Sequence, residues 1–493
     1  MSSDTKTVNN TLYAAVIVGS GFGGLCMGIK LKQAGYTNFL ILEKADSLGG
    51  TWRENTYPGA ECDVGSAFYS YSFAPNPDWD YKWSKQEQIL AYLNQCAKVY
   101  ELNQHLHFNT KVRSATFNES SKTWTITSEA GETFNSRFFI PALGQLHEPN
   151  IPLINGFDSY QGVAFHSAQW RHAVDIKNKN IAVIGNAASA VQLIPEIADD
   201  VKQLSIYQRS ANWILPKGDR PFNRLEKWLA KHTQLLHKWY RLNMWSIGEL
   251  GLLPAIKGSK LHRKILSWYS IRQMKKHIQD PVLQKSLIPD YPIGAKRILL
   301  VDKYYPSLNR DNVELVTEPI DHFTASGIQD ESGKTREHDV VVFATGFKTN
   351  PFLASIDITG KDSRKLREHW KDGAYAFNGV LTNKFPNLFM LYGPNTNTGH
   401  TSVIFMHEVQ SDYIIKLMQK AGEGSIEVHA EPEKNFAAEL QNRLAKMAWN
   451  EVQASWYKQG ERIPNNWPGS TLEYRKRLKS PDWSDYNICS SNR

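Results

Sequence analysis

Three glycines and one acidic residue near the N-terminus have the spacing of a nucleotide-binding turn. Gly19, Gly21 and Gly24 fit the pattern G-x-G-x-x-G, and Glu43 follows 24 residues after the first of them. In such a turn the first glycine permits a tight bend, the second lets backbone amides approach a pyrophosphate, and the third lets helix and strand pack closely. Because a carboxylate at this distance can bind a ribose diol, these residues predict a dinucleotide site, with a purely structural turn as the alternative.

The elements around these residues are the ones that this chemistry needs. Residues 14–18 are apolar and predict a buried strand, and the segment after the turn predicts a helix that runs towards Gln33 and stops at Gly35. The run "NFLILEK" predicts a second strand, which brings Glu43 to the edge of the same sheet. The positive end of the helix would then hold the phosphates.

A second glycine turn follows a predicted strand at 181–184. It reads Gly185-Asn186-Ala187-Ala188-Ser189-Ala190, so alanine stands where the second glycine is usual and a methyl group would face the phosphates. The next strand, "LSIYQRS", leads to Arg209 rather than to an acid, which favours a 2′-phosphate and therefore NADP over NAD. Two nucleotide sites in one chain suggest FAD and NADPH, with the nicotinamide reducing the flavin.

Length and composition are those of an ordinary globular protein. With 493 residues, and about 150 residues per domain, two to four domains are expected. The cysteines form no C-x-x-C pair and have no histidine cluster beside them, so neither a disulfide framework nor a metal site is expected. The N-terminal segment "MSSDTKTVNN" is polar, and no apolar run reaches about 18 residues, so a reducing, cytoplasmic location without a membrane span is predicted.

The loop at 49–63 contains more chemistry than a turn requires. It reads "GGTWRENTYPGAECD", with Trp52, a Tyr-Pro-Gly corner and Asp63. Turns need glycine and proline, but they do not need a tryptophan and a terminal acid. On this stretch the chain resembles the class B flavoprotein monooxygenases, and within them the type I Baeyer–Villiger monooxygenases, whose loop motif is filled here at every position.

A second stretch carries the same resemblance. Gly162, His166 and Trp170 have the family spacing, although Tyr160 replaces a phenylalanine at one end and Arg171 replaces proline or aspartate at the other. Relatives that oxidise nitrogen and sulfur usually carry phenylalanine or tyrosine at the position of the tryptophan. For the histidine, a hinge or hydrogen-bonded structural role is as good an interpretation as proton transfer.

Three later segments extend the resemblance over nearly the whole chain. "YPIGAKR" ends in the pair Lys296-Arg297, "VVVFATGF" is similar to the strand that returns from the NADP domain, and Trp456 matches a late tryptophan. The resemblance implies an α/β fold with two Rossmann-like dinucleotide-binding domains, for FAD and NADP, and a helical insertion.

The implied domains are discontinuous. The FAD domain would comprise 1–150 and 375–493, the NADP domain 155–220 and 300–350, and the helical insertion 221–295. The segment "GQLHEPNIP", with two prolines close together, would link the first two.

The resemblance also implies roles for individual residues. Arg297 and Asp63 are the candidate catalytic residues: the guanidinium would keep a flavin C4a-peroxide anionic and stabilise the oxyanion formed at a ketone carbonyl, and the carboxylate would orient it. A surface or phosphate-binding arginine is the alternative. Lys296 and Arg209 would clamp the 2′-phosphate, and bound NADP+ would shield the peroxide from water. The full set of candidate cofactor-binding residues is Gly19, Gly21, Gly24, Glu43, Thr51, Trp52, Asp63, Tyr69, Val112, Gly185, Asn186, Ala187, Ala188, Ser189, Gln192, Arg209, Ser210, Lys296 and Trp456.

The implied reaction consumes NADPH and O2 and inserts one oxygen atom next to a ketone carbonyl, giving an ester or lactone; sulfides are a further substrate class. A nitrogen- or sulfur-oxygenating flavin-containing monooxygenase is the nearest alternative, and a nucleotide-binding sensor or scaffold is a second. A disulfide reductase is excluded, because the chain has no redox cysteine pair. Linear, cyclic and aryl ketones all stay open.

The insertion carries an unusual charge. Residues 224–276 hold twelve lysines and arginines against two acids, a balance of +10 that exceeds the +8 of the whole chain. Between 225 and 245, leucines and tryptophans recur at helical spacing. A solvated helical face is one interpretation, and weak contact with an anionic membrane surface is another. Nucleic acid is not expected as a partner, because no recognition module is visible.

Overall fold

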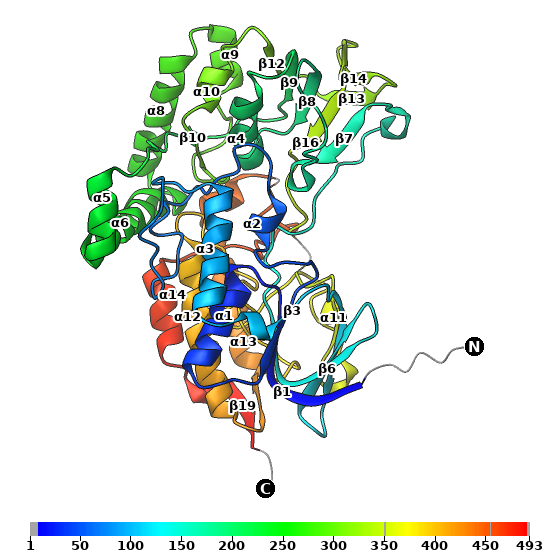
Figure 1. The fold of residues 1–493 in the computed structure, drawn as a ribbon, viewed down its shortest axis with the longest axis vertical. Helices are drawn as coiled ribbons and strands as arrows, with labels where there is room; N and C mark the ends of the chain where they lie inside the picture. The colour runs from blue at the N-terminus through cyan, green and yellow to red at the C-terminus, as the bar shows by residue number, and fades with distance from the viewer. Residues whose placement is uncertain (1–7, 350–351, 454, 491–493) are drawn as a thin grey trace.

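A computed structural model of the chain describes residues 8–349, 352–453 and 455–490, and two large sheets organise it (Figure 1). The first has seven strands in the order β17-β4-β5-β6-β1-β2-β3, and the second has five parallel strands in the order β12-β9-β8-β16-β7. In Figure 1 the first sheet lies in the lower half of the molecule and the second in the upper half. The predicted α/β fold with two Rossmann-like units is confirmed.

Twelve strands of the described residues form the two large sheets. The first sheet contains β1 Val8–Val18, β2 Phe39–Leu42, β3 Leu106–His107, β4 Val112–Asn118, β5 Thr123–Ser128, β6 Thr133–Pro141 and β17 Asp357–Thr359. The second contains β7 Val163–His166, β8 Asn180–Ile184, β9 Gln203–Tyr207, β12 Val313–Val316 and β16 Val340–Phe343. The smaller sheets pair β10 Ile214–Leu215 with β11 Leu299–Leu300, β18 Ser425–Val428 with β19 Tyr486–Cys489, and β13 Ile320–Phe323 with β14 Gly327–Asp330 and β15 Thr335–Glu337.

The helices divide among the two sheets and the insertion. Those of the first unit are α1 Phe22–Gln33, α2 Thr51–Glu54, α3 Gln86–Val99, α11 Leu366–His369, α12 Val403–Ala421, α13 Ala430–Leu444 and α14 Thr471–Lys479. Those of the second unit are α4 Ala188–Ile197 and α10 Tyr304–Ser307. The insertion contains α5 Arg224–His232, α6 Gln234–Ser246, the π-helical turn η4 Ile247–Leu252, α7 Leu253–Ile256, α8 Lys260–His277 and α9 Pro281–Ser286.

The first glycine turn lies in a βαβ unit, as predicted. β1 pairs in parallel with β2 up to Val18 opposite Leu42. α1 ends before Gly35, whose φ of +87° is a conformation that glycine adopts without steric cost. β1 begins earlier than the predicted start at residue 14, because its first half pairs with β6.

The second unit repeats this design with its own core. β8 pairs in parallel with β9 and with the predicted returning strand, β16. α4 buries Val191 and Ile194 against the strands of this sheet, whereas Leu25 and Ile29 of α1 belong to the core of the first unit. Each nucleotide turn therefore rests on a separate hydrophobic core.

Two crossings of the chain connect the units and lie side by side. The amide of Asn150 donates to the carbonyl of Gly346 at 2.9 Å, and the amide of Lys348 donates to the carbonyl of Glu148 at 2.8 Å. The predicted linker is thus one half of a paired connection. Strand β17 lies beyond the second crossing and joins the first sheet, although it precedes residue 375, where the second FAD segment was expected to begin.

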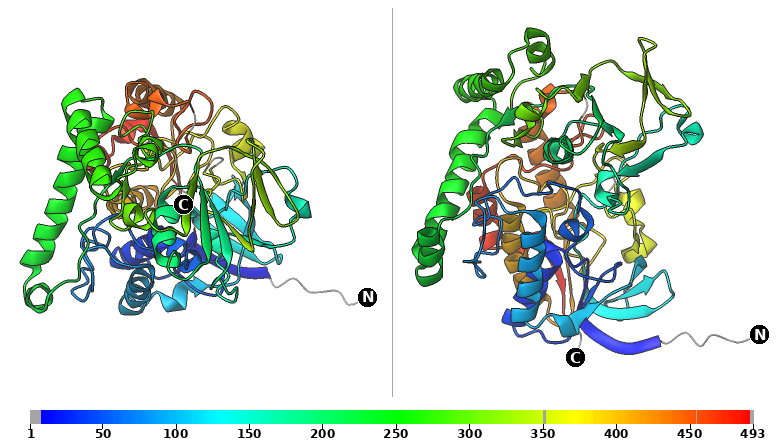
Figure 2. Two further views of the ribbon diagram at one scale, coloured as in Figure 1. Left: turned by 90° about the horizontal axis from the view of Figure 1, so that it is seen from above. Right: turned by 45° about the horizontal axis from the view of Figure 1, so that its top comes forward.

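The insertion is helical, and its helices run along one side of the molecule (Figures 1 and 2). α5 and α6 lie next to each other, and α7 with η4 connects them to α8. Within the described part of the chain, no helix has both the length and the apolar character needed to cross a membrane.

Candidate active site

A cavity of about 380 Å³ is lined by residues of both units. It brings together twelve of the candidate site residues: Gly19, Gly21, Glu43, Thr51, Trp52, Asp63, Tyr69, Val112, Ala188, Ser189, Gln192 and Arg297. The other candidates lie outside its described lining: Gly24, Gly185, Asn186, Ala187, Arg209, Ser210, Lys296 and Trp456. The lining therefore joins residues that are far apart in the sequence.

Backbone crowding explains the glycines of the first turn. Gly19 has φ +105°, and a Cβ atom there would lie 2.7 Å from the carbonyl oxygen of Ala142. A Cβ atom on Gly24 would lie 1.8 Å from the carbonyl oxygen of Gly19, so the helix reaches its place against the turn only with glycine. Gly21 differs, because its φ of −77° suits any residue and a Cβ atom there would make only an ordinary contact, 3.7 Å from the Cα atom of Gly50.

Glu43 is buried and its carboxylate is held from several sides. Ser20 donates to Oε2 from its amide at 3.0 Å and from its hydroxyl at 2.7 Å. Oε1 accepts from the amide of Ala45 at 3.1 Å and lies 3.2 Å from Nη1 of Arg53. This network fixes the carboxylate at the wall of the cavity.

The second turn accommodates its alanine without strain. Gly185 has φ +108° and approaches the carbonyl of Ala344, in the same way as Gly19 approaches Ala142. Ala187 has φ −86° and ψ −163°, close to the −77° and −167° of Gly21 in the first turn. Because this conformation is open to L-residues, the missing glycine does not distort the turn.

Two cations gather beside the second turn. Nζ of Lys296 donates to the hydroxyl of Ser210 at 3.4 Å and lies 4.4 Å from the ring centre of Tyr291. Burial and then the positive charge of Arg209 lower the pKa of Lys296. Two like charges and a hydroxyl held this close form a donor set that suits a phosphate group.

Asp63 and Arg297 meet across 234 positions of sequence. Nε of Arg297 donates to Oδ2 of Asp63 at 2.8 Å, and Nη2 donates to the same oxygen. The carboxylate is the more buried partner, with 16% of its side chain exposed against 38% for the guanidinium. Asp63 raises the pKa of Arg297 further above its ordinary value, so the guanidinium stays positive at any working pH.

Side chains of the loop at 49–63 bind α4 and so join the units. The hydroxyl of Tyr57 donates to Oε1 of Gln192 at 2.8 Å, and Nε2 of Gln192 donates to the carbonyl of Glu61 at 2.9 Å. Burial raises the pKa of Tyr57 to about 12, which keeps it a neutral donor. Lys217 forms a buried salt bridge with Glu61 at 2.6 Å.

Several cavity residues come from segments that the sequence did not mark as part of the site. Four of them carry buried polar atoms without a partner among the described residues: Gln145 Oε1, His147 Nδ1, Thr401 Oγ1 and His407 Nδ1. Burial lowers the pKa of His407 to about 4, so its ring is neutral. Unpaired buried atoms facing a cavity beside a glycine turn fit a large polar ligand such as FAD. A sequence signal that could have pointed to Thr401 and His407 is the polar run "NTNTGHTS", which ends at Ser402, the N-cap residue of α12.

Trp456 and His166 have structural contacts. The carbonyl of Trp456 accepts from Thr349 at 2.9 Å, and its ring centre lies 4.2 Å from that of the buried Tyr457. Nδ1 of His166 accepts from the amide of Ala168 at 3.1 Å and Nε2 faces the carbonyl of Gly346 at 2.9 Å. With both nitrogens occupied, His166 fits the structural interpretation rather than proton transfer.

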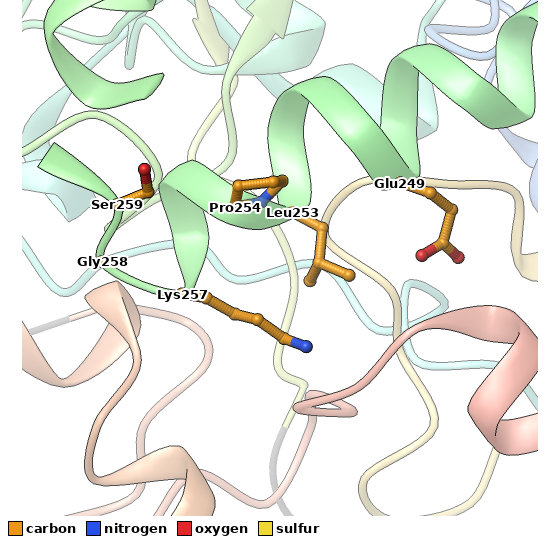
Figure 3. Close-up of a pocket in the computed structure, with 6 residues that line it drawn as sticks. All are labelled: Glu249, Leu253, Pro254, Lys257, Gly258 and Ser259. Atoms are coloured by element: carbon orange, nitrogen blue, oxygen red, sulfur yellow. The ribbon is translucent and has the colours of Figure 1, made fainter. Parts of the chain in front are cut away.

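A second hollow, of about 490 Å³, is formed by the insertion (Figure 3). Its lining consists of Glu249, Leu253, Pro254, Lys257, Gly258 and Ser259 and includes none of the candidate residues. Glu249 already accepts from the amide of Thr471 at 2.6 Å. The first cavity is therefore the candidate active site.

Known proteins resemble the chain over most of its length. The pyridine nucleotide-disulphide oxidoreductase family matches residues 16–244. A Baeyer–Villiger monooxygenase of Pseudomonas aeruginosa is 38% identical over 96% of this chain and 91% of its own.

Two solved structures share the fold. OTEMO in complex with FAD and NADP superimposes with a TM-score of 0.86, at 27% identity over 97% of this chain and 99% of that chain. An oxidised steroid monooxygenase bound to NADP also gives a TM-score of 0.86, at 29% identity over 98% of this chain and 100% of that chain.

Proposed function

Since the chain belongs to the family of Baeyer–Villiger monooxygenases, we propose that it uses NADPH and O2 to convert a ketone into an ester or lactone. The contact between Asp63 and Arg297 inside the shared cavity carries this proposal, because it fixes a permanent cation where the two units meet. Bound FAD supplies the redox chemistry, since it takes up two electrons from the nicotinamide and activates O2. Sulfides form a second substrate class.

The first unit supplies the FAD site. Gly19 and Gly24 shape the turn, Gly21 leaves room for a pyrophosphate, and Glu43 binds the adenosine ribose. The unpaired atoms of Gln145 and the other cavity residues provide further partners for the cofactor. We assign the seven-stranded sheet to FAD and the five-stranded sheet to NADPH, with the segment from 357 onward counted with the FAD domain because of β17.

Arg297 and Asp63 act on the substrate. A guanidinium beside the ketone stabilises negative charge on the carbonyl oxygen as its carbon is attacked. Asp63 holds the guanidinium plane by two hydrogen bonds to one oxygen, so the cation does not swing away. The partly buried pair also keeps the cation at the cavity wall rather than in bulk solvent. The free cysteines fit a reducing, cytoplasmic setting.

A ketone panel tests the reaction. Purified holoenzyme is given NADPH with linear, cyclic and aryl ketones and with a sulfide, and products are identified by mass spectrometry. Esters or lactones, and NADPH oxidation that rises on adding ketone, are expected. Oxidation of the sulfide without any ester would favour a nitrogen- or sulfur-oxygenating enzyme instead, and NADPH oxidation that no substrate raises would favour a sensor.

Replacement of Arg209 by alanine tests the assignment of NADPH. Loss of a charge-assisted phosphate contact should weaken NADPH binding by about ten- to a hundred-fold and leave NADH binding unchanged. The ratio of the KM values for the two cofactors measures this. Arg113→Ala, at another exposed arginine, is the matched control and should keep the parental ratio. If Arg209→Ala keeps the parental ratio of KM values for NADPH and NADH, another residue binds the 2′-phosphate.

A further inference from the structure

The insertion exposes an unusual amount of apolar surface. Of the 18 large apolar side chains left exposed by the described residues, eleven lie between Leu225 and Tyr269. They are Leu225, Trp228, Leu235, Trp239, Leu242, Ile247, Leu250, Leu261, Ile265, Trp268 and Tyr269. Scattered apolar side chains on a surface are ordinary, but such a concentration in one segment marks an interaction site.

α6 turns a stripe of apolar side chains to solvent instead of burying it against the rest of the chain. Leu235, Trp239 and Leu242 recur at helical spacing and are 56–74% exposed. The opposite face carries His237, Arg241 and Met244 and packs inward, where Nη1 of Arg241 donates to the carbonyls of Ala67 and Ser70 at 2.8 and 2.9 Å. Arg241 thus holds the segment that follows Asp63, while the stripe of apolar residues on α6 is turned to solvent.

α8 combines apolar and cationic residues on one exposed face. Leu261, Ile265 and Trp268 follow the i, i+4, i+7 spacing and are 52–64% exposed. The same face continues towards the C-terminus of the helix with the exposed residues Arg272, Lys275 and Lys276. The guanidinium of Arg272 lies 5.2 Å from the ring centre of Trp268.

Only part of the positive charge of the insertion is neutralised. Lys227 pairs with Asp80, Lys231 with Asp78 and Arg263 with Glu451. In contrast, Lys264, Lys275 and Lys276 are exposed and form no salt bridge with any described residue. Unpaired cations therefore lie on the same helix as the exposed Trp268.

We propose that the exposed faces of α5, α6 and α8 bind the surface of an anionic membrane. Tryptophan and leucine enter the boundary between headgroups and acyl chains, while lysine and arginine attract anionic headgroups. The three helices lie along one side of the molecule, so one surface can engage them together (Figure 2). A membrane also concentrates apolar ketones near the enzyme.

Two other partners fit less well. A symmetric second copy would place the same face against itself, and the +10 balance of residues 224–276 would then repel. A nucleic acid would match the charge but would leave the leucine stripes without a role. The mixture of apolar and cationic groups favours lipid.

Vesicle sedimentation of the full-length holoenzyme tests the proposal. The probes are vesicles of phosphatidylcholine alone and vesicles with about 30% phosphatidylglycerol, at low and high salt. Binding to the anionic vesicles that weakens with salt is expected. At about 1 kcal/mol for each cation, the triple variant K264Q/K275Q/K276Q should lose on the order of 100-fold in partition coefficient. The double variant W239S/W268S should lose more than about tenfold.

Control variants remove matched side chains elsewhere. K98Q/K371Q/K476Q removes three exposed lysines outside the insertion, and L153S removes an exposed leucine. Both should bind like the parent, and all variants should keep their ketone-dependent NADPH oxidation in vesicle-free buffer. Equal binding to neutral and anionic vesicles, or an equal loss in the controls, would overturn the proposal. A dimer that W239S/W268S dissociates, or duplex DNA binding without vesicle binding, would do so as well.

Discussion

Replacement of Arg297 by alanine should abolish ester formation while FAD binding and NADPH oxidation persist. The guanidinium is a permanent cation at the cavity wall, and its hydrogen bonds go to Asp63 rather than to a residue of either glycine turn. Removal of one group that stabilises a developing oxyanion costs on the order of 10²–10³ in rate. The ester formed per NADPH oxidised measures the effect, and the missing ester should be matched by hydrogen peroxide.

Three further variants separate charge from structure at this site. Arg297→Lys keeps a charge but loses the planar fork, so only partial recovery of ester is expected. Asp63→Ala should slow the reaction without stopping it, because the carboxylate acts through Arg297. R297A leaves the carboxylate of Asp63 partly buried without its cation, and the double variant D63A/R297A removes that carboxylate. The double variant should therefore have a higher melting temperature than R297A, and it should still make no ester. Near-parental ester from R297A would mean that the catalytic cation is another residue.

Replacement of Gly24 by alanine should abolish FAD binding. The added methyl carbon would lie 1.8 Å from the carbonyl oxygen of Gly19, and both atoms belong to backbone that cannot turn away as a side chain can. α1 must then move off the turn, which disrupts the phosphate site and the core that Leu25 and Ile29 fill. The flavin content of the purified protein and its melting temperature report the result.

Gly21→Ala is the matched control. Its φ of −77° suits alanine, and the nearest atom to the new methyl group lies 3.7 Å away. This variant should therefore fold like the parent and lose only affinity for FAD, since the methyl group would face the pyrophosphate. If Gly24→Ala holds FAD as the parent does, the close contact between turn and helix is not what fixes this site.

The sequence by itself determined the two nucleotide-binding units. Their signals are local: Gly19 and Gly185 stand where the backbone needs a positive φ, and the alternation of strand, turn and helix follows from apolar runs a few residues long. The sequence did not reveal that Ala187 is free of strain, since only the dihedral angles show that its position does not need glycine. It also placed β1 too late, because the first half of that strand exists only by pairing with β6.

The tertiary structure alone decided how the cavity is assembled. Asp63 and Arg297 are 234 residues apart, and their contact depends on how the loop at 49–63 packs against the second unit through Tyr57 and Gln192. His407 enters the cavity because α12 packs against α1, and no local pattern encodes that packing. For the insertion, the sequence left a solvated face and contact with a membrane surface both open, and only the structure shows that the apolar residues of α6 and α8 point outward. Periodicity fixes which residues share a face of a helix, but only contacts with the rest of the chain fix which face meets solvent.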